Sequence, residues 1–223
     1  MINQIISCLD AATWADAAAT SVIDIVLQVC QMNGSCSVML TGGRSAERLY
    51  QAWARRPEFS QMRNVRFYFG DERCVPPEDL ESNYGMVMRS LFRFGVPPTC
   101  SVIRINAEQP DREAAAAAYE AQLPDNLDIL LLSVGEDGHV ASIFPHSPVI
   151  TETTRKVVFV RCPRAPSKRI SISPLVIRAA QRCIVMALGS QKRAVYEELL
   201  RDPTDIKTLP ARLALDRTWI FGE

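Results

Sequence analysis

The chain has 223 residues, 48% of them hydrophobic, and its 25 acidic residues equal its 25 basic residues in number. A chain without net charge is not expected to be a general nucleic-acid-binding protein, and no apolar run is long enough to span a membrane. We expect a cytoplasmic protein, because the first ten residues lack a secretory leader pattern and the seven cysteines are scattered, odd in number and without a Cys-x-x-Cys pair.

Hydrophobic spacing and turn residues predict that strands alternate with helices along the chain. The expected elements are, in chain order, a helix at 11–32, a strand at 36–40, a helix at 44–55, a strand at 65–69, a helix at 82–94, a strand at 102–105, an alanine-rich helix near 111–120, a strand at 127–134, strands at 157–160 and 170–172, a short helix at 174–180, a strand at 183–188, a helix at 191–200 and a strand at 218–221. Such alternation indicates crossover units. Residues 1–223 are therefore expected to form a single α/β domain, Rossmann-like and three-layered, whose doubly wound, mostly parallel sheet has helices on both faces.

Two helix starts in this pattern suggest a site for an anion. Gly42 and Gly43 follow the first strand, and Arg44 and Ser45 then begin a helix; the later helix at 191–200 begins in the same way, with Lys192 in its first turn. Cations at a helix start face the positive end of the helix dipole, which costs about 0.3–1 kcal/mol each. A phosphate held between the two starts would explain both cations. The alternative is a pair of ordinary tight turns.

Three charged residues, Asp71, Glu72 and Arg73, follow the strand at 65–69. At the carboxyl end of a parallel strand they lie where an open α/β sheet binds its ligand. A carboxylate there can orient or deprotonate a reactant, and an arginine can hold phosphate or stabilise an oxyanion. The plainer interpretation is a solvated loop with internal ion pairs.

The most informative stretch is the loop that follows the apolar strand at 127–134. It reads GEDGHVASIFP over 135–145, so two glycines permit a sharp turn that carries Asp137 and His139. We predict that His139 takes part in chemistry at the carboxyl edge of the sheet. A histidine that only caps a turn is the alternative.

The loop at 163–169 adds prolines and basic residues, among them Arg169. It is either a solvated basic loop or a lid that brings an arginine to a phosphate. No second histidine or cysteine stands at ligand spacing from His139 or His146, so we predict no metal.

Four blocks in this order resemble the 6-phosphogluconolactonases, within the superfamily that also holds the glucosamine-6-phosphate deaminases. The blocks are TGGRS at 41–45; GDERCVP at 70–76 with SNY at 82–84; GEDGHVASIFP at 135–145; and Arg169 with GSQKRA at 189–194. The third block is the most specific. The deaminases have a motif similar to GHIAFNEP at this point. Its glutamate would align with Phe144, which cannot exchange a proton. Two residues depart from the usual pattern. Ala46 stands where proline is frequent, which loosens the helix start without removing a functional group, and Val140 replaces a frequent threonine, a mild change.

The resemblance implies hydrolysis of 6-phospho-D-glucono-1,5-lactone in the pentose phosphate pathway, with no metal or organic cofactor. It implies that His139 is the general base for water and that Asp137 or Asp71 holds the imidazole or the water. Arg73 would stabilise the negative charge of the tetrahedral intermediate or bind the polar edge of the substrate. The 6-phosphate would be held by a set of main-chain and basic groups: Gly42, Gly43, Arg44, Ser45, Arg169 and Lys192. The expected partner is this small sugar phosphate lactone alone, and the expected state is a monomer or a weak homo-oligomer.

Two other functions share the phosphate site. One is an isomerase or deaminase of amino-sugar phosphates, against which Phe144 argues. The other is a sugar-phosphate sensor without catalysis, which needs the phosphate groups but not His139 together with Asp71 and Arg73.

Overall fold

The computed structural model of the chain describes residues 5–202 and 204–223 and is centred on a seven-stranded sheet. Its strands are β1 (Ile5–Cys8), β2 (Cys36–Leu40), β3 (Val65–Phe69), β5 (Ser101–Val102), β6 (Ile129–Ser133), β9 (Arg182–Leu188) and β10 (Thr218–Gly222). They stand in the order β1-β10-β9-β6-β2-β3-β5, and every neighbouring pair is parallel. The predicted fold class is confirmed.

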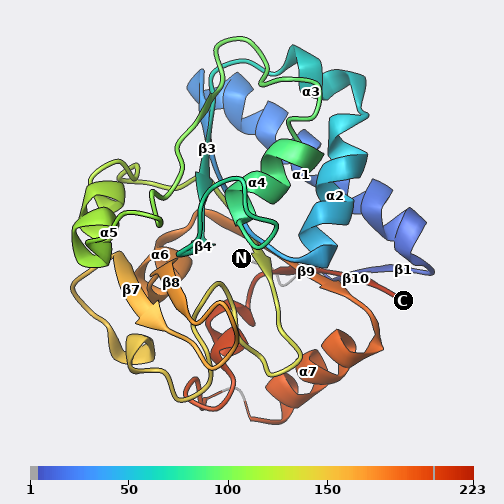
Figure 1. Cartoon of the computed structure of the whole chain (residues 1–223). Helices are drawn as coiled ribbons and strands as arrows, with labels where there is room; N and C mark the ends of the chain where they lie inside the picture. The colour runs from blue at the N-terminus through green and yellow to red at the C-terminus, as the bar shows by residue number, and fades with distance from the viewer. Residues whose placement is uncertain (1–4, 203) are drawn as a thin grey trace.

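Helices cover both faces of this sheet (Figure 1). On one face lie α1 (Ala11–Asn33), α2 (Arg44–Ala54), the short α3 (Pro57–Gln61) and α4 (Asn83–Ser90); on the other lie α5 (Arg112–Glu120), α6 (Pro174–Ala179) and α7 (Ser190–Arg201). α1 packs on α2 and α2 on α4, whereas α7 packs on β9. Right-handed crossovers explain the division, because connections that run toward β5 and connections that run toward β1 must lie on opposite faces.

The core lies between these layers and follows from the apolar runs of the sequence. The residues of β6 from Ile129 to Leu132 have no exposed surface, and Trp14, Trp53 and Trp219 are fully buried, as their spacing predicts. α1 ends where Gly34 adopts φ 74°, a left-handed conformation that glycine tolerates best. No helix in the described part of the chain combines the length and apolar character needed to cross a lipid bilayer.

A second, three-stranded sheet corrects the predicted assignment of two strands. β4 (Asp71–Arg73), β8 (Lys168–Ile172) and β7 (Val157–Arg161) form an antiparallel sheet with β8 in the centre. The strands expected at 157–160 and 170–172 are therefore outside the parallel sheet. Asp71, Glu72 and Arg73, which the sequence suggested as a loop, form a strand because they pair with residues 169–171.

Smaller differences concern the ends of elements. The four-residue edge strand β1 and α3 were not expected, and the helix expected at 82–94 ends at Ser90. The strand expected at 102–105 is reduced to Ser101–Val102. Two short 3-10 helices, η1 (Pro148–Thr151) and η2 (Pro210–Ala214), complete the chain.

The strand order places a crevice at the carboxyl ends of β2 and β6. From β2 the chain continues toward β3, and from β6 it continues toward β9, although β2 and β6 are neighbours. The loops that leave their carboxyl ends therefore diverge to opposite faces. Open α/β sheets bind ligands at this type of switch point.

Candidate active site

A hollow of about 180 Å³ opens at the switch point between β2 and β6. The predicted site residues that line it are Gly42, Gly43, Arg44, Asp71, Arg73, His139, Arg169 and Lys192. Ser45 and Asp137 do not line it, but each is bonded to a residue that does: Ser45 to Lys192 and Asp137 to His139. The structure thus brings together every residue that the sequence predicted for the site.

His139 is held by Asp137 at the tip of the loop that follows β6. Its Nδ1 lies 2.5 Å from Asp137 Oδ1, while Arg164 Nη2 lies 3.2 Å from the other oxygen, Oδ2. Burial raises the pKa of Asp137, but the hydrogen bond and charge of His139, together with Arg164, outweigh it and lower the pKa to about 2. Asp137 is therefore a carboxylate at neutral pH. It is hydrogen-bonded to Nδ1 of His139, which leaves Nε2 as the ring nitrogen available to a water molecule.

Gly135 makes this arrangement possible. A Cβ atom at this position would lie 2.1 Å from both Cε1 and Nδ1 of His139 and 2.7 Å from Asp137 Oδ1. The imidazole therefore folds back over a stretch of main chain that carries no side chain. The turn is closed by hydrogen bonds from Gly138 N to Gly135 O at 3.0 Å and from Gly135 N to His139 O at 2.9 Å.

Asp71 has a different set of partners. Its Oδ1 accepts a hydrogen bond from Asn83 Nδ2 at 3.0 Å, its Oδ2 accepts one from Ser142 Oγ at 2.6 Å, and Arg169 Nη1 lies 3.9 Å from Oδ2. Asp71 and Arg169 are only 5% and 6% exposed, so this is a buried ion pair whose polar atoms are satisfied. Of the two carboxylates left open by the sequence, Asp137 contacts the imidazole and Asp71 fixes Arg169.

Asn83 and Ser142 are site residues that sequence reasoning did not single out, although both lie in the blocks that carried the resemblance. The sequence feature that could have pointed to Asn83 is Gly42. A Cβ atom on Gly42 would lie 2.0 Å from Asn83 Oδ1, so the close approach of α4 to the turn after β2 requires glycine there.

Strand alternation separates the three charges of β4. Glu72 points away from the hollow, is 3% exposed and accepts hydrogen bonds from the main-chain N–H groups of Asn83 and Tyr84, both at 2.7 Å. Burial raises its pKa although these bonds oppose the change. Glu72 therefore anchors the start of α4, while Asp71 and Arg73 reach the hollow.

Arg73 stands directly opposite Arg169 across the β4–β8 ladder. Like charges at facing positions of two strands destabilise a sheet. Both side chains line the hollow, so an anionic ligand would relieve the repulsion.

The starts of α2 and α7 are linked by the side chain of Lys192. Gly43 and Gly189 precede α2 and α7 with φ values of 97° and 102°, a region of backbone conformation that only glycine adopts readily. Among the described residues neither start has a side-chain cap, which leaves the first N–H groups for a ligand. Lys192 Nζ donates to Ser45 Oγ at 3.0 Å and so joins the two starts. Burial, and then the charge of Arg44, lowers the pKa of Lys192 to about 8.

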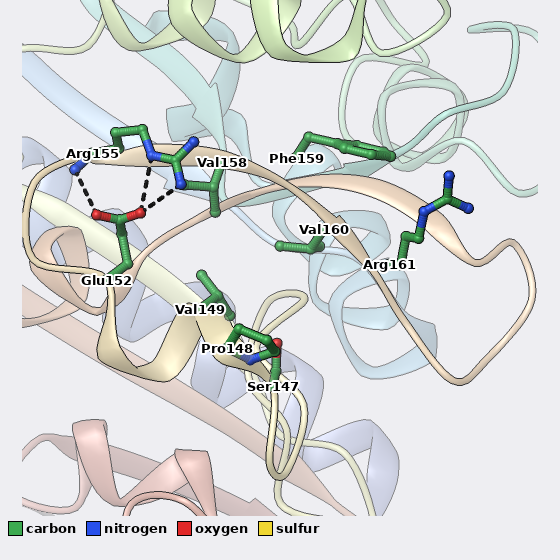
Figure 2. Close-up of a pocket in the computed structure, with 9 residues that line it drawn as sticks. All are labelled: Ser147, Pro148, Val149, Glu152, Arg155, Val158, Phe159, Val160 and Arg161. Carbon is green, nitrogen blue, oxygen red and sulfur yellow. Dashed lines mark hydrogen bonds and ion pairs between the residues drawn. The ribbon is translucent and has the colours of Figure 1, made fainter.

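A larger hollow, of about 260 Å³, lies between η1 and β7 (Figure 2). Glu152 and Arg155 at one end bond to each other, with Arg155 Nη2 at 2.7 Å from Glu152 Oε2, and valines form much of the wall. None of the predicted site residues lines it. In residues 5–202 and 204–223, no three histidine, cysteine or carboxylate side chains are grouped as metal ligands.

Comparison with known proteins gives this site a family. The model of the family "Glucosamine-6-phosphate isomerases/6-phosphogluconolactonase" matches residues 9–220. The chain belongs to this family. A 6-phosphogluconolactonase of Streptomyces coelicolor is 36% identical over 208 residues, which cover 85% of this chain and 79% of the relative. The resemblance found in the four sequence blocks is thereby confirmed.

Solved structures of the family share the whole fold. The 6-phosphogluconolactonase from Trypanosoma cruzi superimposes with a TM-score of 0.85 at 27% identity, covering 100% of this chain and 96% of that one. A monomeric glucosamine-6-phosphate deaminase reaches a TM-score of 0.84 at 17% identity, covering 99% and 97%. The architecture is therefore common to both branches of the family, and the activity has to be inferred from the site.

Proposed function

We propose that the chain hydrolyses 6-phospho-D-glucono-1,5-lactone to 6-phospho-D-gluconate in the oxidative pentose phosphate pathway. The main support is one arrangement: His139, which is bonded to Asp137, lines the same hollow as two cationic, uncapped helix starts. The first part suits the activation of water beside a carbonyl group, and the second suits a phosphate. The names of the curated relatives agree with this activity.

His139 is the general base of the reaction. Its Nε2 accepts a proton from water as the water oxygen attacks the lactone carbonyl carbon, and the carbonyl electron pair moves to the oxygen. A positioned general base of this kind typically contributes about 10²–10⁴-fold to the rate. Asp137 keeps the proton of the ring on Nδ1 and stabilises the imidazolium that forms. The intermediate then collapses, the bond from the carbonyl carbon to the ring oxygen breaks, and the imidazolium returns its proton to that oxygen.

Charge on the intermediate is balanced by arginine. Arg73 lines the hollow from β4 and donates to the main-chain oxygen of Glu81, and its guanidinium lies 3.7 Å from the Glu81 carboxylate. We assign Arg73 to the oxyanion or to the polar edge of the substrate. Arg169, fixed by Asp71, acts at the phosphate.

The phosphate fixes where the lactone carbonyl sits. Main-chain N–H groups at Gly43 and at the start of α7, with Arg44, Ser45, Arg169 and Lys192, supply charge and hydrogen bonds. A ligand held at one end of a small hollow presents its other end to His139 in one orientation, which converts binding energy into catalysis.

The proposal includes no metal and no organic cofactor, and it gives the chain no nucleic-acid or membrane partner. We place the reaction in the cytoplasm and expect a monomer or a weak homo-oligomer. The free state of all seven cysteines agrees with a reducing compartment.

A deaminase or isomerase of amino-sugar phosphates is the second candidate, since the deaminase branch shares the fold. At the position where the deaminase motif has a glutamate, this chain has Phe144, which has no proton to exchange. A sensor without catalysis remains third, because it has no need of the His139–Asp137 pair.

The deciding experiment measures two reactions with the purified protein. Lactone hydrolysis is followed against the spontaneous rate in a coupled assay of 6-phosphogluconate, and ammonia release from glucosamine 6-phosphate is measured in parallel. We expect the first activity only, and we expect His139→Ala to remove most of it. Ammonia release would favour the deaminase, tight phosphosugar binding without turnover would favour the sensor, and undiminished hydrolysis by His139→Ala would refute the assigned base.

A further inference from the structure

Phe144 lies flat against the imidazole of His139. The two ring centroids are 4.2 Å apart and the planes differ by 16°, which is a stacked geometry. The guanidinium carbon of Arg169 lies 5.6 Å from the centroid of the same phenyl ring. Phe144 is only 2% exposed and lies behind the wall of the hollow, so it supports two site residues without reaching the ligand.

The imidazole is thus restrained from three directions. Asp137 holds Nδ1, the bare Cα of Gly135 lies close to the Nδ1–Cε1 edge, and the phenyl ring covers one face. A hydrogen bond to one ring nitrogen fixes the direction of that nitrogen but allows the ring to tilt about it. A flat neighbour parallel to the ring removes this tilt.

We propose that Phe144 is a positioning residue for His139, whose stacked ring fixes the plane of the imidazole and so the direction of Nε2. The assignment of a catalytic consequence rests on the proposed lactone hydrolysis. The stacking itself concerns only the geometry of the protein and can be tested without any substrate.

The stack also suits the charge that develops during the reaction. The face of a phenyl ring carries partial negative charge, so it attracts a cation placed over it. His139 becomes an imidazolium when it takes the proton of water, and at that moment it lies over this face. An aliphatic side chain at position 144 offers neither the flat surface nor the attraction.

Kinetics separate positioning from binding. In Phe144→Leu we expect kcat for the lactone to fall roughly 10- to 100-fold, the scale on which small misplacement of a catalytic group acts. KM should change much less than kcat, because Arg169 loses its contact with the ring but keeps its partners Asp71 and Pro166. Phe144→Tyr keeps the ring and is expected to retain most of kcat. The matched control is Phe159→Leu, the same change at a half-buried phenylalanine on the wall of the hollow in Figure 2, which should leave both constants unchanged.

Proton NMR tests the geometry independently of activity, because the chain has only two histidines. Protons of an imidazole stacked on a phenyl face are shielded by its ring current, so the His139 signals should lie upfield of those of His146. His146→Gln assigns them. The upfield displacement should persist in Phe144→Tyr and disappear in Phe144→Leu.

Each result decides one of the two claims. His139 signals at the ordinary imidazole position in the unmodified protein would overturn the stack, whether or not Phe144→Leu folds. Shielded signals combined with an unchanged kcat in folded Phe144→Leu would overturn the positioning role. A shielded His139 in a protein that hydrolyses no lactone would refute the proposed function and leave the stack standing.

Discussion

Asp137→Asn is the sharpest test of the catalytic pair, because it removes a charge and changes little else in size. Asp137 Oδ1 lies 2.5 Å from His139 Nδ1, and the side chains are 30% and 19% exposed. Two unit charges about 4 Å apart attract by about 4 kcal/mol at an effective dielectric constant of about 20. Partial exposure lowers this to about 2–3 kcal/mol, which is roughly a 30- to 150-fold loss of rate.

A second effect acts in the same direction. The amide of asparagine can donate a hydrogen bond to Nδ1, which would leave the ring proton on Nε2, where the base needs a lone pair. We therefore expect kcat to fall by about 10²-fold or more, with KM little changed because the partners of Asp137 are His139 and Arg164, neither of which is assigned to the phosphate.

The assay is the initial rate of lactone hydrolysis, corrected for the spontaneous reaction at each substrate concentration. Asp125→Asn, the same change at an exposed position outside the site, is the control and should match the unmodified enzyme. A folded Asp137→Asn protein with kcat within twofold of the unmodified enzyme would show that the carboxylate does not support the base.

Two further predictions concern the phosphate end of the hollow. Lys192→Ala should raise KM for the phosphorylated lactone far more than KM for the unphosphorylated sugar lactone, and an equal loss for both would remove Lys192 from the phosphate site. Because burial and Arg44 lower the pKa of Lys192 to about 8, this side chain is charged below pH 8 and loses its proton above it. Calorimetry should accordingly show that affinity for 6-phosphogluconate is steady from pH 7 to about 8 and then falls by up to about tenfold per pH unit, whereas in Lys192→Arg, which stays charged, the fall should be absent.

The parallel sheet could be predicted because buried parallel strands appear in a sequence as short apolar runs, as at 36–40 and 127–134. In the second sheet, the strands near 157–160 and 170–172 could also be predicted, but β4 could not, since it consists of three charged residues and gains its structure from pairing with residues about a hundred positions later. The same applies within the site. Two residues of separation place Asp137 and His139 in one loop, but the choice between Asp137 and Asp71 depends on side-chain directions that only the folded loop defines. In the sequence Phe144 stands out for the proton it cannot exchange, whereas its contact with His139 exists only in the folded loop, where Ala141 has a φ of 49°.

The proposed anchor for the phosphate and the proposed catalytic groups are built from different parts of the chain. Much of the anchor is main chain, namely the first N–H groups of α2 and α7 behind two glycines in a conformation that other residues avoid. Such groups do not change when side chains are substituted. The groups that we propose to act on water, in contrast, are side chains on one loop of eleven residues, 135–145. Substitutions in this loop could therefore change the reaction catalysed within a lineage, while its members continue to bind sugar phosphates.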